Sequence, residues 1–390
     1  MQFDRGVRLI DQNGFRMGPF ASCLLPLFRA ADVVAEEHTD VSVDWSSVDV
    51  VTDRNNLRKL LRWLQNPEVP ANNGAVAGSS DPSKEAGLSF VAAREAALRD
   101  FRIDFQLGGR KTVLLHRWET RTRELAQPPR SGCGLNFEQE STRPAKGCLR
   151  STGHHRIVTY VSIQPACYGD RDSHVYHTCH TQDMGGLKLV VRCEVDACLP
   201  QPEATTSRAA NGTTTLALSE PKTANDDNLA NMMSELDVSS PSSPEDPASE
   251  SITDINVIRA GTIVPQSDTI EVTTRSVRYI DEFDWTEQYP QLFLSYTPNI
   301  FLAVHDRGTF ERMIQRKLGT SELRAVEQSP RIQRAFRQLV AVLREIQALA
   351  TSFGKDARLS LVCRDGKLEV FKRTNGEGSL EEAELERFDA

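Results

Sequence analysis

The sequence predicts an α+β fold in which mixed β-sheets are flanked by helices, and three patterns carry this prediction. Residues 187–197 and 269–277 alternate with the period of two that places successive strand side chains on opposite faces. Residues 331–353 carry apolar side chains at helical spacing along one face. Two short apolar runs within 359–372 flank an Asp-Gly dipeptide, which is a strong signal for a tight hairpin.

The other predicted elements follow in chain order. Residues 53–65 are expected to form a helix, because their leucines recur at helical spacing. Residues 101–107 and 112–119 are expected to form two strands, which a Gly-Gly pair joins as a hairpin. The apolar run 299–305 is short enough for a buried strand.

The negative charge of the chain is concentrated in one segment. The formal net charge is −8, and residues 201–254 account for all of it, with ten acidic and two basic residues. This segment has no aromatic residue, so it cannot bury enough apolar surface to offset its ordering entropy. We therefore expect one domain formed by residues 1–200 and 255–390, interrupted by a disordered acidic insertion at 201–254. A second polar stretch, 66–84, is expected to be a shorter loop.

Composition excludes some classes of protein. No run of about eighteen apolar residues is present, so no membrane span or membrane partner is predicted. The N-terminus lacks the apolar core of a secretory signal, and the eight cysteines are scattered. They are expected to be reduced thiols in a nuclear or cytoplasmic protein. Outside 201–254 the charges balance, which argues against broad, nonspecific nucleic-acid binding.

Four carboxylates and an amide recur in separate segments. Glu194 and Asp196 lie two residues apart on one predicted strand, so they share a face, and Glu271 lies on another strand. Glu138 falls on a predicted helix, and Gln291 follows in a later segment. Taken singly, such strand carboxylates are typical of a solvated face. Their order along the chain favours a site where converging carboxylates bind divalent metal ions that activate water.

Five stretches recur in one order along the chain: 50–61, 135–139 (Leu-Asn-Phe-Glu-Gln), 193–197 (Cys-Glu-Val-Asp-Ala), 270–276 (Ile-Glu-Val-Thr-Thr-Arg-Ser) and 291–310. Together they resemble the DXO family of decapping nucleases, which includes the fungal nuclear partner of the exoribonuclease Rat, and 50–61 is similar to the family's arginine motif. The resemblance runs from about residue 50 to residue 373. It implies a fold similar to the PD-(D/E)XK nuclease core.

The resemblance also implies a role for each matching residue. The implied ligands of one or two Mg²⁺ or Mn²⁺ ions are Glu138, Glu194, Asp196, Glu271 and the carbonyl of Val272. Arg54 would contact an RNA phosphate, since a planar guanidinium grips phosphate oxygens. Gln291 would touch the scissile phosphate or its water. Two metal ions in such a site would stabilise the attacking and leaving oxygens.

The activity that the resemblance implies is metal-dependent decapping of RNA 5′ ends in mRNA quality control. Members of the family hydrolyse incomplete caps and NAD caps, and some degrade RNA from 5′ to 3′. The implied partners are the RNA 5′ end and a 5′-to-3′ exoribonuclease.

Thr273 departs from the family pattern, because a lysine is expected at this position among the catalytic residues. Threonine cannot offer a charge to the attacking water or the phosphate. Arg275 shares the predicted strand face and is the candidate to reach back to the substrate, although arginine is a poor base. Two hypotheses therefore stand: a hydrolase that works through its four carboxylates, and a catalytically impaired RNA-binding or exoribonuclease-partner protein.

A crowded group of zinc-like residues deserves comparison with known zinc sites. His174, His177, Cys179 and His180 lie within seven positions. Structural zinc sites usually combine two close pairs separated by a longer gap. A polar loop or an edge strand is therefore expected here rather than a zinc site.

Overall fold

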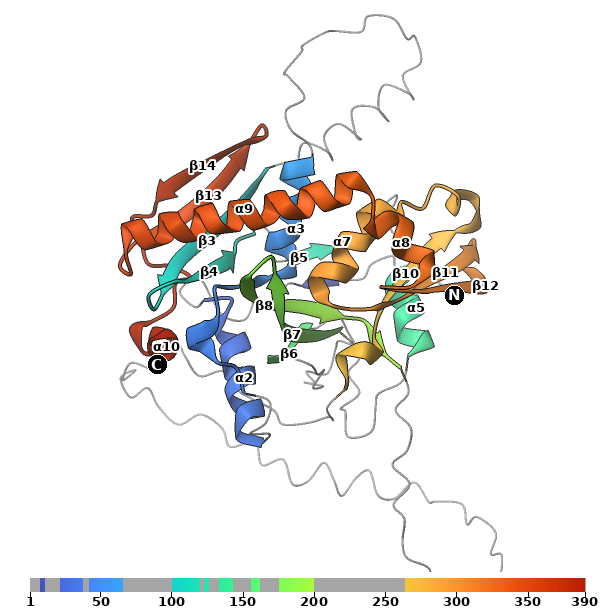
Figure 1. Ribbon diagram of the computed structural model, residues 1–390. Coiled ribbons are helices and arrows are strands. Elements are labelled where there is room, and N and C mark those ends of the chain that lie inside the picture. The colour runs from blue at the N-terminus through green and yellow to red at the C-terminus, as the bar shows by residue number, and fades with distance from the viewer. Residues whose placement is uncertain are drawn as a thin grey trace, which may run out of the picture. The chain divides into compact units, whose positions relative to one another are not determined.

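The computed structural model describes residues 8–10, 22–37, 42–65, 100–119, 123–125, 133–142, 156–161, 175–199 and 264–389 (Figure 1). The acidic segment 201–254 and the polar stretch 66–84 lie outside these residues. So do His174 and the side chains of the other zinc-like residues, although 175–184 is described as a strand. Sheets of mixed strand direction packed with helices confirm the predicted α+β class.

The larger sheet of the described residues has eight strands and mixed directions. Their order across the sheet is β14 (Lys367–Lys372), β13 (Arg358–Arg364), β3 (Phe101–Gly108), β4 (Thr112–Arg117), β2 (Val50–Asp53), β8 (Leu187–Val195), β7 (Val175–Met184) and β6 (Arg156–Val161). The pairs β4–β2, β2–β8 and β7–β6 are parallel, and the other pairs are antiparallel. The two central parallel strands, β2 and β8, therefore end at the same edge of the sheet.

Two apolar clusters bury the two faces of this sheet. Helices α3 (Arg54–Gln65) and α9 (Pro330–Phe353) cover one face, where Leu60 and Leu339 pack with Phe105 and Leu189. In Figure 1, α9 lies across β3 and β4 beside α3. The second cluster joins α2 (Leu25–Glu37), the opposite face and the C-terminal segment, and includes Val190. Strand β8 is therefore buried on both sides from Leu189 to Cys193, and its second face is not a solvated one there.

A smaller sheet continues from the end of β8. Its order is β12 (Thr309–Lys317), β11 (Asn299–Asp306), β10 (Thr269–Ser276) and β9 (Ala197–Cys198). Strands β10 and β11 are parallel, and α7 (Trp285–Ser295) lies between them in the chain. Strand β8 ends at Val195 and β9 begins at Ala197, so Asp196 is the single residue between the two sheets.

The remaining described elements are short. They are β1 (Arg8–Ile10) paired with β5 (Arg123–Leu125), α5 (Gly134–Ser141), α8 (Ser321–Glu327), α10 (Glu382–Leu385) and the 3-10 turns η2 (Trp45–Ser47), η4 (Gln266–Asp268), η5 (Val277–Tyr279) and η6 (Glu386–Phe388). Helix α5 rests on β10 through Phe137, which packs with Ile270 and Val272.

Most of the predicted elements are confirmed with small shifts of their ends. The hairpin of β13 and β14 turns at Asp365 and Gly366, whose φ angles of 49° and 80° are left-handed, as its two-residue turn requires. The sequence did not predict α7, which contains Gln291, or strand β12. Asp284 caps α7, because its carboxylate accepts hydrogen bonds from the N–H groups of Thr286 and Glu287.

A buried ion pair ties the ends of β2 and β8 together. Arg192 Nη2 donates to Asp53 Oδ2 at 2.8 Å, and a second bond joins Nε to Oδ1. The side chains are only 1% and 8% exposed, and Arg192 Nη1 also donates to the carbonyl of Cys23 at 2.6 Å. Asp53 directly precedes Arg54, and Arg192 lies two residues before Glu194. The pair therefore fixes the two strand ends that carry candidate site residues.

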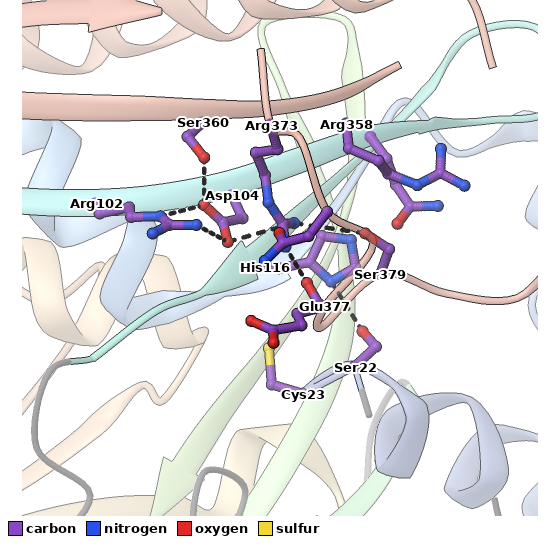
Figure 2. A network of polar contacts seen from close by, with 12 residues as sticks. Ser22, Cys23, Arg102, Asp104, His116, Arg358, Ser360, Arg373, Glu377 and Ser379 are labelled. Atoms are coloured by element: carbon purple, nitrogen blue, oxygen red, sulfur yellow. Dashed lines mark hydrogen bonds and ion pairs between the residues drawn. The ribbon is translucent and has the colours of Figure 1, made fainter. Parts of the chain in front are cut away.

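A second buried polar network lies on β3, β4 and β13. Figure 2 shows Asp104 at its centre, with Arg102 Nε at 2.6 Å, Ser360 Oγ at 2.6 Å and Arg373 Nη1 at 3.4 Å. His116 faces Asp104 across the β3–β4 pair, and its Nδ1 lies 2.8 Å from Ser22 Oγ. This network anchors the chain before α2 and the chain after β14 to the sheet.

Candidate functional site

The candidate residues come from five elements that meet where the two sheets join. Strand β8 brings Glu194 to its carboxyl end, and Asp196 follows in the one-residue link to β9. Strand β10 carries Glu271 next to β9, since Ile270 pairs with Ala197. Helix α5, which packs on β10, carries Glu138, and Arg54 opens α3 directly after β2.

Glu271 is the best-defined member of this group. Its Oε2 lies 3.1 Å from Arg54 Nη1, and its Oε1 accepts a hydrogen bond from Gln291 Nε2. The Arg54 and Glu271 side chains are only 13% and 9% exposed. A charged hydrogen bond in such surroundings is much less screened than one at the surface. Glu271 therefore connects β10 to the start of α3 and to α7.

Asp196 lies close enough to the other three carboxylates to be affected by their charges. Its Oδ2 accepts a hydrogen bond of 2.7 Å from the N–H of Val272. Burial raises the pKa of Asp196 well above its ordinary value. Three further negative charges raise it in the same direction, those of Glu271, Glu138 and Glu194. The site thus concentrates negative charge at the junction of the sheets.

Arg54 is the cation that faces this concentration of charge. Burial alone would lower the pKa of Arg54, but the surrounding negative groups raise it above its ordinary value. Those groups are the carboxylates of Glu271, Glu194 and Asp196. Arg54 is therefore charged at every physiological pH, and it lies at the carboxylates rather than in solvent.

The two residues that bear on the missing lysine lie further along β10. Thr273 is half-buried, two positions after Glu271 on the same strand. Arg275 follows two positions later, and its Nε donates to the carbonyl of Tyr279 at 3.1 Å. Its guanidinium also lies 5.8 Å from the centre of the Tyr279 ring. In this structure Arg275 is thus engaged by the turn after β10.

The residues of the site can be compared with the ligands that a divalent cation needs. The donor set is chemically suitable, because carboxylate and carbonyl oxygens are the ligands that Mg²⁺ and Mn²⁺ prefer. The crowding that raises the pKa of Asp196 is also what a cation would relieve. Yet among the described residues no three Asp, Glu, His or Cys side chains are arranged as metal ligands. Glu271 holds Arg54 and Gln291 instead, so a metal ion has to compete with Arg54 for this carboxylate.

The sequence interpretation missed three residues beside the site. Arg58 and Arg62 follow Arg54 at intervals of four along α3, and both lie against Glu287 of α7. Glu287 precedes Gln291 by four residues on α7, so these two polar side chains lie on the same side of the helix. The signal was present in the sequence as an arginine at every fourth position from 54 to 62.

Comparison with known proteins finds one family and a set of weak structural likenesses. No protein with a curated description is significantly similar to this chain in sequence. Rai1 of S. pombe has a TM-score of 0.46 at 12% identity, over 88% of this chain and 75% of that chain. Scheffersomyces stipitis Rai1, in complex with (3'-NADP)+ and calcium ion, has a TM-score of 0.48 at 12% identity, over 94% and 78%. Candida albicans Rai1, in complex with pU5-Mn2+, has a TM-score of 0.43 at 10% identity, over 98% and 83%.

These TM-scores lie below 0.5, so no residue role is transferred from those structures. None of the helices in the described part of the chain is long and apolar enough to cross a membrane. Residues 161–363, a little over half of the chain, match the family described as Domain of unknown function (DUF8563), and the chain therefore belongs to this family.

Proposed function

We propose that this protein is a metal-dependent hydrolase that acts on the 5′ ends of RNA, as a divergent relative of the DXO decapping nucleases. The observation that supports this proposal best is the position of Asp196, which accepts a hydrogen bond from the N–H of Val272 beside Glu271 and lies near the charges of Glu138 and Glu194. Each of these four carboxylates lies in a stretch that resembles a family motif, and they reach one place from α5, β8, the β8–β9 link and β10. The nearness of these residues, which lie far apart in the sequence, supports the combination that the resemblance implies.

Each group of side chains has a separate role in the proposed reaction. The four carboxylates would hold the metal ion, and Val272 would offer its carbonyl beside Glu271. Arg54 lies 3.1 Å from Glu271 and can exchange this partner for a phosphate oxygen, which suits a guanidinium equally well. Gln291 orients the reacting water or phosphate from α7. When bound, Mg²⁺ or Mn²⁺ would supply charge stabilisation for the attacking and leaving oxygens.

The substrate proposed is an RNA with an incomplete 5′ end, such as a 5′-triphosphate or an NAD cap. The protein would act in quality control of mRNA 5′ ends in the nucleus. The acidic segment 201–254 is proposed to be an insertion within one domain, since its composition provides no aromatic anchor.

The experiment compares wild type with Glu194→Gln and Asp196→Asn on short RNA carrying a 5′-triphosphate or an NAD cap. Wild type with Mn²⁺ is expected to release the 5′ group, and both variants are expected to lose release while keeping the wild-type melting temperature. The matched control is Asp183→Asn, which changes an exposed carboxylate at the other end of the β7–β8 hairpin. Release that persists in EDTA or in both variants would contradict this mechanism.

A second candidate function is an RNA-binding protein with impaired catalysis that serves an exoribonuclease. Two observations favour it: threonine occupies position 273, and Arg54 occupies the carboxylate of Glu271. An absence of release by wild type, together with RNA binding in EDTA, would select this candidate.

A further inference from the structure

One flank of α3 carries a row of arginines that starts at the carboxylates and runs away from them. Arg54, Arg58 and Arg62 are four residues apart, so each lies about one turn, roughly 6 Å, beyond the last. We call these three residues the arginine row. Its first member contacts Glu271, and its second and third members meet Glu287 on the neighbouring helix α7.

Arg58 is the member of the arginine row whose burial is least accounted for by its contacts. Its side chain is only 21% exposed, and its nearest acidic oxygen, Glu287 Oε1, is 3.7 Å away. Burial, together with the positive charges of Arg62 and Arg54, lowers the pKa of Arg58 to about 10, although the charges of Glu271 and Glu287 oppose this shift. Three guanidinium groups held this close repel one another, and an anion placed among them removes that repulsion.

Glu287 behaves as a shared and exposed counter-ion. The same Oε1 accepts from Arg62 Nε at 2.9 Å and faces Arg58, while the Glu287 side chain is 48% exposed. An exposed carboxylate of this kind contributes little stability and can be displaced at little cost. Successive phosphates of a nucleic-acid strand offer the same type of acceptor, and the arginine row presents further guanidinium groups beyond Arg54 to bind them.

Lys59 shows that a basic residue of α3 can be held by local carboxylates outside the arginine row. Lys59 follows Arg58 directly and is similarly covered, at 16% exposed. Its Nζ lies 2.8 Å from Glu119, which also accepts from Arg117 and Asn55. Lys59 thus belongs to a local polar cluster and does not point along the row.

We propose that the arginine row is a phosphate track, along which a single-stranded RNA lies with its 5′ end at the carboxylates, and that Glu287 covers Arg58 and Arg62 until RNA displaces it. This inference rests on the proposed RNA substrate and adds the path of the strand. Arg58 and Arg62 are positioning residues in it, since they hold phosphates away from the reacting bond.

The test is binding of a fluorescent, 5′-phosphorylated oligouridine to the full chain in EDTA, measured by anisotropy over a range of salt concentrations. Each lost phosphate contact on a single strand reduces the slope of log K against log salt by about 0.7. Arg58→Gln and Arg62→Gln are each expected to reduce the slope by this amount and to weaken binding about tenfold. Lys59→Gln should keep the wild-type affinity and slope, and Glu287→Gln should bind more tightly than wild type.

Equal affinity and slope for wild type, Arg62→Gln and Glu287→Gln would overturn the phosphate track, even if Arg58→Gln failed to fold. Arg58→Lys is expected to recover the slope, because it restores the charge, and only part of the affinity, because it lacks the planar fork. Because EDTA prevents turnover, this outcome is independent of hydrolysis. A protein that shows the expected slopes but releases no 5′ group would contradict the proposed hydrolase and leave the track standing.

Discussion

Arg54 Nη1 lies 3.1 Å from Glu271 Oε2, so the residue expected to hold RNA holds one of the expected metal ligands. The two side chains are nearly buried, and Gln291 occupies the other oxygen of Glu271. In the proposed function a metal ion and the guanidinium would therefore compete for one carboxylate. Substrate that draws Arg54 onto a phosphate would free Glu271 for the metal ion, which links RNA binding to metal binding.

Arg54→Gln is expected to bind Mn²⁺ more tightly than wild type, by about tenfold or more, because a unit positive charge leaves the cluster. The same change is expected to weaken binding of RNA. Isothermal titration with Mn²⁺ in the absence of RNA measures the first effect. Lys59→Gln removes a charge from the same helix without touching the cluster, and its Mn²⁺ affinity should equal that of wild type. An unchanged affinity in Arg54→Gln would mean that Glu271 does not take part in binding.

The buried pair of Arg192 and Asp53 should be essential for stability. Arg192→Met is expected to lower the free energy of unfolding by about 3–5 kcal/mol, because it leaves a buried carboxylate without its partner. Asp53→Leu combined with Arg192→Met should be closer to wild type than either single change, since no uncompensated charge remains. Urea unfolding curves with a shared slope give the three free energies. A double variant that is no more stable than the single variants would show that the pair acts through packing.

Stability should fall in mild acid because of His116. Burial holds the pKa of His116 at about 3, and the charges of Arg373 and Arg358 also lower it, while that of Asp104 opposes them. The unfolded chain binds this proton near pH 6.5, whereas the folded chain stays neutral. Unfolding thus becomes easier as the pH falls below about 6.5, by about 1.4 kcal/mol for each unit until the folded pKa is reached.

His116→Gln should remove this part of the acid dependence, which denaturant unfolding between pH 7 and pH 4.5 would measure. His305→Gln is the control variant. The ring of His305 is more accessible than that of His116, although burial lowers the pKa of His305 as well. A wild-type acid dependence in His116→Gln would assign the loss of stability to carboxylates instead.

The parts of the fold that could be predicted are those encoded by local periodicity. The period of β8 and β10, the apolar stripe of α9 and the Asp-Gly turn each depend on neighbouring residues, and the structure confirms them. Helix α7 escaped prediction because Pro290 interrupts its pattern and its cap at Asp284 lies in a polar segment. The contact of Arg54 with Glu271 joins residues 217 positions apart, and no local pattern specifies such a pair.

Residues 201–254 are expected to be dispensable for folding. They carry no Phe, Trp or Tyr, so their removal takes away little apolar surface that a core could use. Replacing them with a short Gly/Ser linker should leave the melting temperature within a few degrees of the full chain. Loss of cooperative unfolding in calorimetry would show that the segment packs against the domain.

Thr273 is expected to set the rate of the proposed reaction. It lies two residues after Glu271 on β10, at the position where the resemblance implies an ammonium group beside the reacting phosphate. Losing one well-placed electrostatic donor typically costs about 10²–10³ in rate. Thr273→Lys should therefore raise kcat by up to this factor, with a smaller effect on KM, on a triphosphate or NAD-capped RNA.

Arg275 provides the matched control for this change. Its guanidinium is engaged by the carbonyl and ring of Tyr279, so Arg275→Ala is expected to leave kcat close to that of wild type. If Arg275 instead turned to the substrate and replaced the missing lysine, Arg275→Ala would abolish activity and Thr273→Lys would add little. In a third outcome, neither wild type nor Thr273→Lys releases a 5′ group, although both fold and bind Mn²⁺. This result would mean that the carboxylates serve binding rather than hydrolysis. Single-turnover assays of the three proteins with one RNA separate these cases, because they measure the chemical step without product release.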